Sequence, residues 1–200
     1  PDKPALKVQR AMEPDPAPEK LESAAEILRG ARQAIILAGN GVVRGHASAS
    51  LVAFAERLRI PVATTFMAKG AISAFHPLSL GTIGIQAKDY VSSGFEAADV
   101  IVCVGYDMVE YHPKLWNPNG DKPIVHVDFL PAEVDHNYIV DVEIVGDLAH
   151  TLWMLNERVA EKETPLFDIP LHKRIREEMQ EDFAEHKDDD TEGSIRPQKV

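Results

Sequence analysis

Residues Asp99–Tyr111 read Asp-Val-Ile-Val-Cys-Val-Gly-Tyr-Asp-Met-Val-Glu-Tyr, and this stretch decides the fold. Five consecutive apolar residues, Val100–Val104, lie between an acidic residue and a glycine. An unbroken apolar run is typical of a strand buried on both faces, as at the centre of a parallel sheet. Gly105 allows a tight turn directly after this strand. We therefore expect Tyr106–Tyr111 at the carboxyl edge of the sheet, where open α/β sheets bind ligands.

The remainder of the chain repeats this pattern of strand followed by helix. Apolar runs predict four further strands, at Ala34–Ala38, Pro61–Phe66, Pro123–Asp128 and Val140–Val145. Helical spacing of apolar residues predicts helices over Glu19–Arg29, Ala47–Leu58, Gln86–Ala97 and Leu148–Val159, with a long loop before the third. Alternation of this kind predicts an α/β fold built on a parallel sheet.

Composition limits the class of protein. The chain has 200 residues, of which 44% are hydrophobic, enough for one domain with tails. No apolar run is long enough to span a bilayer, so we expect a soluble, cytoplasmic protein without a membrane partner. The net charge is −11, and nine acidic residues against one basic residue lie between Glu177 and Glu192. This acidity argues against nucleic acid as a partner.

The chain ends differ from its middle in composition. Residues 1–18 hold five of the 14 prolines and are predicted to be a linker, and residues 19–160 are predicted to be the domain. Residues 161–194 are predicted to be a helical and acidic linker. Residues 195–200 resemble the start of another element. The linker at residues 161–194 carries one narrow apolar stripe, at Leu171, Ile175, Met179 and Phe183, which can pack on a surface but cannot form a core.

Two types of candidate site follow from the residues alone. The turn Gly39-Asn40-Gly41 could hold a phosphate or could be a tight turn between strand and helix; the dinucleotide pattern G-x-G-x-x-G would need glycine where Arg44 stands. Carboxylates also follow the predicted strands, and they could form an acid/base pair, although helix capping or hydrogen bonding to a ribose is favoured: Asp107, Glu110, Asp128 and Asp147.

Other reactive side chains have simpler interpretations. His126 and Asp128 share one face of a predicted strand, and a hydrogen-bonded strand histidine is favoured over a metal ligand. Cys103 lies inside an apolar strand, where an inert packed thiol is favoured over a reactive one. The aromatic residues near Gly105 could wall a pocket or cover the end of the sheet: Tyr106, Tyr111 and Trp116.

The run Gly105–Asn117, followed by Gly120-Asp121 and Ile124–Asp128, resembles the central domain of acetolactate synthases. It is nearer to the flavin-free catabolic type than to the biosynthetic type. Shorter stretches support the resemblance, which covers Leu21–Val159: Ile35–Gly41, Thr64–Gly84, Asp135-His136 and Gly146-Asp147. It implies a three-layer Rossmann-like domain with a six-stranded parallel sheet.

The resemblance also implies an activity. Acetolactate synthases condense two pyruvates to 2-acetolactate and CO2 with thiamine diphosphate and Mg²⁺, for acetoin and butanediol formation or for branched-chain amino acids. The family places its activating glutamate in an N-terminal domain and a Gly-Asp-Gly motif with paired asparagines in a C-terminal domain. Here Leu148 follows Gly146-Asp147, and no Asn-Asn pair occurs. The resemblance thus implies a scaffolding fragment, inactive alone, whose partners are the missing domains of a homo-oligomeric parent.

Biosynthetic relatives hold FAD in this domain, in a structural role. Carried over by position, the residues lining that groove would be Gly39, Gly41, Gly84, Asp128 and Asp147. Their pattern Gly-Val-Arg-Phe-Asp-Asp-Arg is replaced by Gly105–Tyr111, so both arginines are lost, and the second acid of Asp-Ile-Asp is replaced by Leu130. Without arginines a buried diphosphate is costly, so we predict weak or absent FAD binding. Tyr111 is then the residue expected to approach substrate.

Three alternatives stay open at this stage. The chain could be the central domain of a different thiamine-diphosphate carboligase or decarboxylase. It could be a free-standing module that binds NAD, ADP or FAD. It could also be a purely structural oligomerisation domain. Only the second predicts tight nucleotide binding by the chain itself.

Overall fold

Six parallel strands form one sheet in the computed structural model, which describes residues 14–84, 90–159 and 169–186. The strand order is β3-β2-β1-β4-β5-β6. The bounds are β1 Ala34–Ala38, β2 Val62–Thr64, β3 Ser79–Thr82, β4 Val100–Val104, β5 Ile124–Asp128 and β6 Val142–Val145. At the centre, β1 and β4 pair in register from Ala34 opposite Val100 to Ala38 opposite Val104. The predicted α/β class and six-stranded parallel sheet are confirmed.

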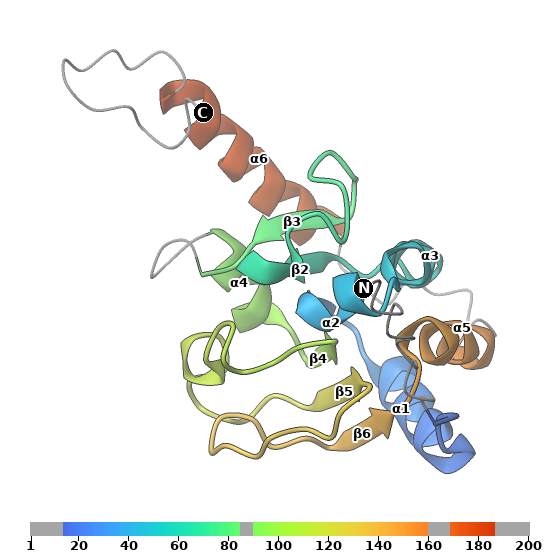
Figure 1. Ribbon diagram of the computed structural model, residues 1–200. Helices are drawn as coiled ribbons and strands as arrows, with labels where there is room; N and C mark the ends of the chain where they lie inside the picture. Colours follow the sequence, from blue (N-terminus) through green and yellow to red (C-terminus); the bar gives the residue numbers. More distant parts are fainter. Residues whose placement is uncertain (1–13, 85–89, 160–168, 187–200) are drawn as a thin grey trace, which may run out of the picture.

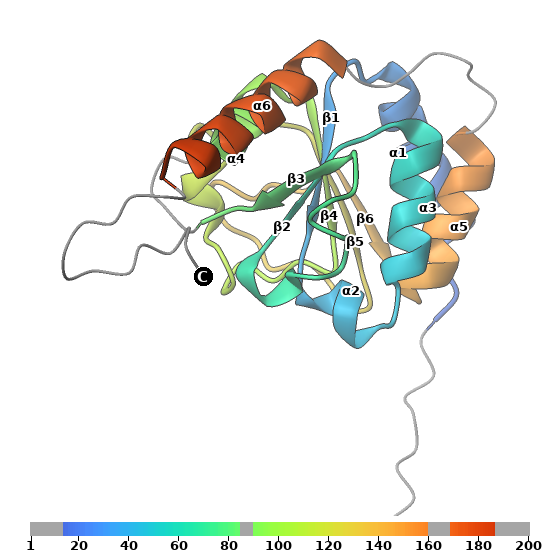
Figure 2. The same ribbon diagram turned by 90° about the horizontal axis from the view of Figure 1, so that it is seen from above.

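Helices cover both faces of this sheet (Figures 1 and 2). One face carries α1 (Pro18–Gly30), α3 (Ser48–Leu58) and α5 (Leu148–Val159), and the other carries α4 (Tyr90–Ala97) and α6 (Ile169–His186). Three single-turn elements lie in the loops: α2 (Asn40–Arg44), η1 (Phe66–Ala68) and η2 (Pro113–Leu115). No helix within the described ranges is long and apolar enough to cross a membrane.

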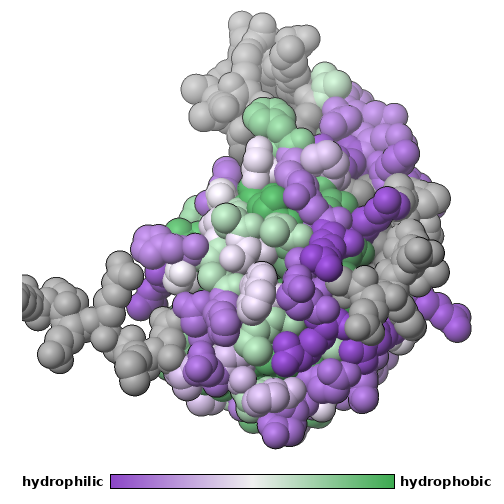
Figure 3. Space-filling view, turned by 90° about the vertical axis from the view of Figure 1, so that its right-hand side faces the viewer, coloured by the Kyte–Doolittle hydropathy of each residue, from purple (hydrophilic) through white to green (hydrophobic). Residues whose placement is uncertain are grey.

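The apolar runs are buried on both sides, as the sequence predicts. Every residue of β1, β4 and β5 is buried. Because side chains alternate along a strand, Ile36 and Ala38 enter the core beneath α1, α3 and α5, whereas Ile35 and Leu37 enter the core on the α4 side. The side of the molecule that carries α1, α3 and α5 is covered largely by hydrophilic residues, with apolar residues between them (Figure 3).

The structure departs from the sequence predictions in the stretch before α4. Residues Ser79–Thr82, expected in a loop, form the edge strand β3, which is short, contains Gly81 and has a register shift against β2. The second strand is shorter than predicted, because Phe66 starts η1. A helical turn, α2, follows the first strand directly. The predicted helix from Gln86 is described only from Tyr90, and its first residues lie outside the described ranges, as do residues 1–13, 160–168 and 187–200.

The narrow stripe of α6 packs on the surface of the domain. Ile175 is buried against the core on the α4 side, and Met179 is partly buried there. The side chains of Leu171 and Phe183 lie outside the described set. Arg176 donates to the carbonyl oxygens of His76 and of Ser79, the latter at 3.0 Å, which ties α6 to the start of β3.

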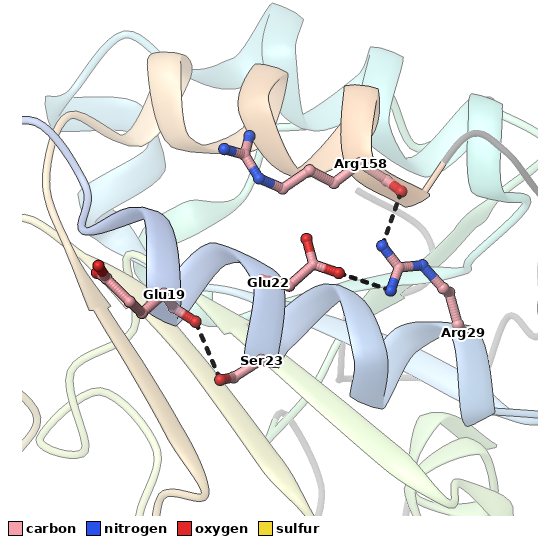
Figure 4. Close-up of polar contacts among 5 residues, drawn as sticks. All are labelled: Glu19, Glu22, Ser23, Arg29 and Arg158. Atoms are coloured by element: carbon pink, nitrogen blue, oxygen red, sulfur yellow. Dashed lines mark hydrogen bonds and ion pairs between the residues drawn. The ribbon is translucent and has the colours of Figure 1, made fainter.

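A second contact joins α1, the first helix of the domain, to α5, the helix that follows the last strand of the sheet (Figure 4). The Arg29 guanidinium donates to a Glu22 carboxylate oxygen at 2.8 Å and to the carbonyl oxygen of Arg158 at 3.2 Å. The carbonyl belongs to the last turn of α5, where backbone oxygens lack helical partners and a cation is favoured. The ends of α1 and α5 are therefore fixed to each other.

We expect Gly105→Ala to destabilise the domain by about 3 kcal/mol. Gly105 has φ +59°, and a Cβ there would lie 2.5 Å from the backbone nitrogen of Val42. The matched control is Gly30→Ala, because a Cβ on Gly30 meets nothing within 4 Å. The control should shift stability by less than about 1 kcal/mol. Urea unfolding measures both, and equal effects would contradict the proposed backbone constraint.

Candidate functional site

The carboxyl edge of the sheet contains a topological switch point between β1 and β4. From β1 the chain continues toward β2 on one side, and from β4 it continues toward β5 on the other. In doubly wound sheets the crevice at this point is the usual ligand site. The candidate site is therefore formed by the β1–α2 turn and the loop after β4.

Backbone from the loop after β4 fills this crevice. The N–H of Gly39 donates to the Val104 carbonyl at 2.9 Å, and the N–H of Gly41 donates to the Gly105 carbonyl at 2.8 Å. A Cβ on Gly41 would lie 2.5 Å from the Cα of Gly105. The glycines at 39 and 41 therefore permit two backbone segments to touch, and their N–H groups are already used by the protein.

The Glu110 carboxylate accepts a hydrogen bond from the third N–H group of the turn, that of Asn40. It accepts the Asn40 N–H with both oxygens, at 3.0 and 3.1 Å, and it accepts the Thr65 hydroxyl. A longer contact of 3.4 Å joins it to the N–H of Asp107. One half-buried carboxylate thus joins the β1–α2 turn, the end of β2 and the loop after β4. The sequence placed Glu110 at this edge, but nothing in the pattern indicated Thr65 as its partner.

Two of the predicted carboxylates cap backbone. Asp128 accepts the N–H groups of Phe129 at 2.6 Å and Leu130 at 3.2 Å. Asp147 accepts the N–H of His150 at 2.6 Å and so caps α5. The capping interpretation is confirmed for Asp147. Burial raises the pKa of Asp128 to about 6, and the nearby charges of Asp107 and Glu110 add to the effect.

Gly84 and Tyr111 meet at the other side of the same edge. Gly84 has φ +89°, and a Cβ there would lie 2.6 Å from Cδ2 of the Tyr111 ring. The Tyr111 carbonyl accepts the Tyr106 hydroxyl at 2.5 Å. The structure therefore brings Gly39 together with Gly41, and Gly84 together with Tyr111. Asp147, in contrast, lies at the start of α5 and caps that helix.

Aromatic residues cover the sheet beside this edge. Tyr106 and Trp116 are buried and in edge-to-face contact, with ring centroids 5.8 Å apart, and Tyr138 packs against both. The Trp116 Nε1–H donates to the Tyr106 hydroxyl at 3.2 Å. Of the two interpretations of these aromatics, covering the sheet end is confirmed for Tyr106 and Trp116.

The buried polar groups beneath the aromatics are paired with each other. His126 Nδ1 lies 2.7 Å from the Tyr138 hydroxyl, and Nε2 lies 3.4 Å from the Leu130 carbonyl. Burial lowers the pKa of His126 and raises the pKa of the Cys103 thiol to about 12, so both stay neutral. The interpretation of His126 as a hydrogen-bonded strand residue is confirmed, and Cys103 is packed and buried as predicted. Among the described residues, no group of three or more His, Cys, Asp or Glu side chains is placed to hold a metal.

We expect Glu110→Ala to lower the free energy of unfolding by about 2 kcal/mol, because it leaves the Asn40 N–H and the Thr65 hydroxyl without their acceptor. Glu110→Gln keeps an acceptor oxygen and should lose less. Glu133 is exposed, so Glu133→Ala is the matched removal of a carboxylate. Urea unfolding with unchanged slope is the measurement. A loss in Glu133→Ala as large as in Glu110→Ala would contradict this role.

The raised pKa of Asp128 predicts a pH-dependent stability. A folded pKa of about 6, against an ordinary value of 3.8 for this carboxyl, means that the folded state holds the proton more tightly. The resulting stabilisation is complete below the lower value and is lost as the pH rises through about 6. Asp128→Asn keeps an acceptor for both N–H groups and removes the ionisation. Its stability relative to the native protein should therefore be greater at pH 7.5 than at pH 4.5, by on the order of 2 kcal/mol. A difference independent of pH would contradict the prediction.

Comparison with known proteins shows which family this chain resembles. Residues 21–155 match the family described as "Thiamine pyrophosphate enzyme, central domain". A probable acetolactate synthase large subunit of Methanococcus aeolicus is 38% identical over 133 residues, which cover 65% of this chain and 22% of that protein. The acetolactate synthase of Bacillus subtilis is 31% identical over 137 residues, covering 68% of this chain and 24% of that protein.

A third relative is named as catabolic. The catabolic acetolactate synthase of Raoultella terrigena is 44% identical over 80 residues, which cover 40% of this chain and 14% of that protein. The chain thus spans about a quarter or less of these relatives. Since the family match covers more than half of the chain, from α1 into α5, the chain belongs to the thiamine pyrophosphate enzyme family, of which it carries the central domain.

Proposed function

We propose that this chain is the central domain of an acetolactate synthase, nearer the catabolic type. The parent enzyme condenses two pyruvates to 2-acetolactate and CO2 with thiamine diphosphate and Mg²⁺. The observation that carries the proposal is the match of residues 21–155 to the central-domain family, together with relatives that are named acetolactate synthases. A different thiamine-diphosphate carboligase with the same central domain is the runner-up.

The proposed role of the domain is architectural. It spaces two flanking domains of the same cytoplasmic, homo-oligomeric polypeptide and closes one side of the reaction pocket. Residues 1–18 and 161–194 are proposed as the linkers, and residues 195–200 as the start of the next domain. Two features support a rigid spacer: the fully buried central strands and the Arg29 tie between α1 and α5.

We propose that the described residues do not hold thiamine diphosphate. Its diphosphate is held through a divalent metal, and no group of three or more ligating side chains is placed for one within the described ranges. We therefore assign the cofactor, which supplies the carbanion when bound, to the flanking domains. The contribution proposed for this chain is positional, with Tyr111 as the side chain that approaches substrate from beside Gly84.

The parent is proposed to work without FAD. Glu110 already occupies the turn that would face a diphosphate, and Gly39 and Gly41 donate to backbone carbonyls. Burial raises the pKa of Asp128, and the charges of Asp107 and Glu110 lie close enough to raise it further, so a diphosphate here would meet like charge. No arginine lies within Gly105–Tyr111 to neutralise it. On this proposal Gly39, Gly41, Gly84, Asp128 and Asp147 have structural roles.

An assay of the intact polypeptide that contains this chain tests the proposal. With pyruvate, thiamine diphosphate and Mg²⁺ it should form acetolactate at a rate that added FAD leaves unchanged. The 200-residue chain alone, under the same conditions, should form none. A product other than acetolactate would favour the runner-up. A requirement for FAD would overturn the flavin-free assignment, and turnover by the chain alone would overturn the architectural role.

A further inference from the structure

The ring of Tyr111 lies directly on the backbone of Gly84. Gly84 follows β3 and has φ +89°, and a Cβ there would lie 2.6 Å and 2.7 Å from Cδ2 and Cε2 of the ring. Only a glycine permits so close a contact. The N–H of Ile83 donates to the Thr64 carbonyl at 2.9 Å, which attaches the residue before Gly84 to the end of β2. The surface under the ring is therefore fixed to the sheet.

The backbone of Tyr111 is held by two buried side chains. Its carbonyl oxygen accepts the Tyr106 hydroxyl at 2.5 Å and the Trp116 Nε1–H at 3.4 Å. The same Nε1–H also donates to the Tyr106 hydroxyl at 3.2 Å. Tyr106 and Trp116 are each only 3% exposed. Because water does not reach these donors, it does not compete for the hydrogen bonds that hold Tyr111.

Packing fixes the two donors in turn. The ring centroid of Trp116 lies 5.8 Å from that of Tyr106 and 5.7 Å from that of Phe95 in α4. The Tyr138 ring packs against Tyr106 with centroids 5.5 Å apart. Closely packed core side chains occupy one arrangement, so the Tyr106 hydroxyl is held in place under the Tyr111 carbonyl.

The residue before Tyr111 is anchored as well. Glu110 accepts the Asn40 N–H at 3.0 Å, and it accepts the Thr65 hydroxyl. Tyr111 is therefore held at three points: its ring, its own carbonyl and the residue that precedes it.

Tyr111 differs in exposure from the side chains that hold it. Tyr106 and Trp116 are buried and already cover the end of the sheet, whereas Tyr111 is half-buried at the carboxyl edge. A half-exposed side chain that is fixed by packing and by hydrogen bonds from its neighbours is typical of a preorganised binding group. Covering the core does not require such an arrangement.

We infer that Tyr106 and Gly84 are positioning residues, which hold Tyr111 in the orientation in which its ring meets substrate. This inference rests on the proposed function, which gives the contact with substrate to Tyr111 alone. Tyr106 acts through the Tyr111 carbonyl, and Gly84 acts through the Tyr111 ring. Neither residue touches substrate itself.

Fluorine NMR tests whether Tyr106 holds Tyr111. The label is meta-fluorotyrosine at position 111 of the 200-residue chain, and its signal is compared in Tyr106→Phe and in Tyr138→Phe. Each substitution removes one buried hydroxyl and keeps the ring, but the Tyr138 hydroxyl lies 2.7 Å from His126 Nδ1, whereas the Tyr106 hydroxyl is bonded to Tyr111. Tyr106→Phe should shift or broaden the signal, and Tyr138→Phe should leave it in place. No change in Tyr106→Phe, or an equal change in both variants, would overturn the inference.

Kinetics of the intact polypeptide test whether this hold matters for substrate. Tyr106→Phe should raise KM for pyruvate about threefold, as expected for the loss of one hydrogen bond, with a smaller change in kcat. Tyr138→Phe should change neither, and loss of folded enzyme alone would lower the apparent kcat without moving KM. In a Tyr111→Ala background Tyr106→Phe should add nothing, because Tyr106 acts only through Tyr111. An unchanged KM in Tyr106→Phe, or an undiminished effect in the Tyr111→Ala background, would refute the positioning role.

Two glycines of the same conformation test the support under the ring. Gly84 and Gly81 have φ +89° and +88°, so alanine strains the backbone equally at both. A Cβ on Gly81 would lie 3.1 Å from the terminal methyl of Met179, which can move aside, whereas a Cβ on Gly84 meets the Tyr111 ring. Both alanine variants should melt at a lower temperature, but only Gly84→Ala should displace the fluorine signal at position 111 and raise KM. Equal displacement in the two variants would rule out a specific role for Gly84.

The two proposals can fail separately. If the intact polypeptide makes acetolactate but Tyr106→Phe moves neither the fluorine signal nor KM, the positioning role is wrong and the proposed function stands. If Tyr106→Phe moves both but pyruvate yields another product, the positioning role stands and the assignment as an acetolactate synthase fails.

Discussion

The structure depends on one close approach between backbone segments at the switch point of the sheet. Gly39 and Gly41 after β1 lie against Gly105 after β4, and hydrogen bonds of 2.9 and 2.8 Å run from the first loop to Val104 and Gly105. Neither loop could come this near if it carried a Cβ at these positions. This contact joins the two halves of the sheet at the place where many related folds leave room for a ligand. It turns a potential binding crevice into part of the protein's own packing.

Electrostatics at the edge follow from that closure. A helix start and a turn with free N–H groups attract an anion, and here the anion is the carboxylate of Glu110. Because the charge is supplied by the chain itself, no exchange with a solute is needed to satisfy the turn. The effect of this added charge is seen at the end of β5, the next strand of the sheet. There Asp128 is buried and close to Asp107 and Glu110, and its pKa is raised to about 6. The edge is therefore already negative, which disfavours a bound phosphate.

Sequence reasoning succeeded where a single pattern determined the outcome. The apolar runs at β1, β4 and β5 define strands buried on both faces, because only a central position in a parallel sheet gives such runs their environment. It failed at β3, where Ser79–Thr82 contains a glycine and lies at the sheet edge, so the strand depends on pairing with β2 and on Arg176 from α6. It placed Glu110, Asp128 and Asp147 at the correct edge, and the backbone groups that Asp128 and Asp147 cap lie within three residues of them. It could not assign the partners of Glu110, because Asn40 and Thr65 come from loops far away in the sequence, and local spacing carries no information about them.

The same distinction explains why the exposure of Val43 and Phe66 could not be predicted. Val43 lies between the first predicted strand and the predicted helix Ala47–Leu58, and Phe66 is the last residue of the predicted strand Pro61–Phe66. Only the early end of β2 at Thr64 and the helical turn at Asn40 rotate these side chains outward. Exposure of this kind costs the isolated domain free energy, roughly 25 cal/mol for each Å² of apolar surface left in water. The close approach at Gly105 therefore has two consequences: it closes the ligand crevice, and it orders the turn that carries the exposed Val43.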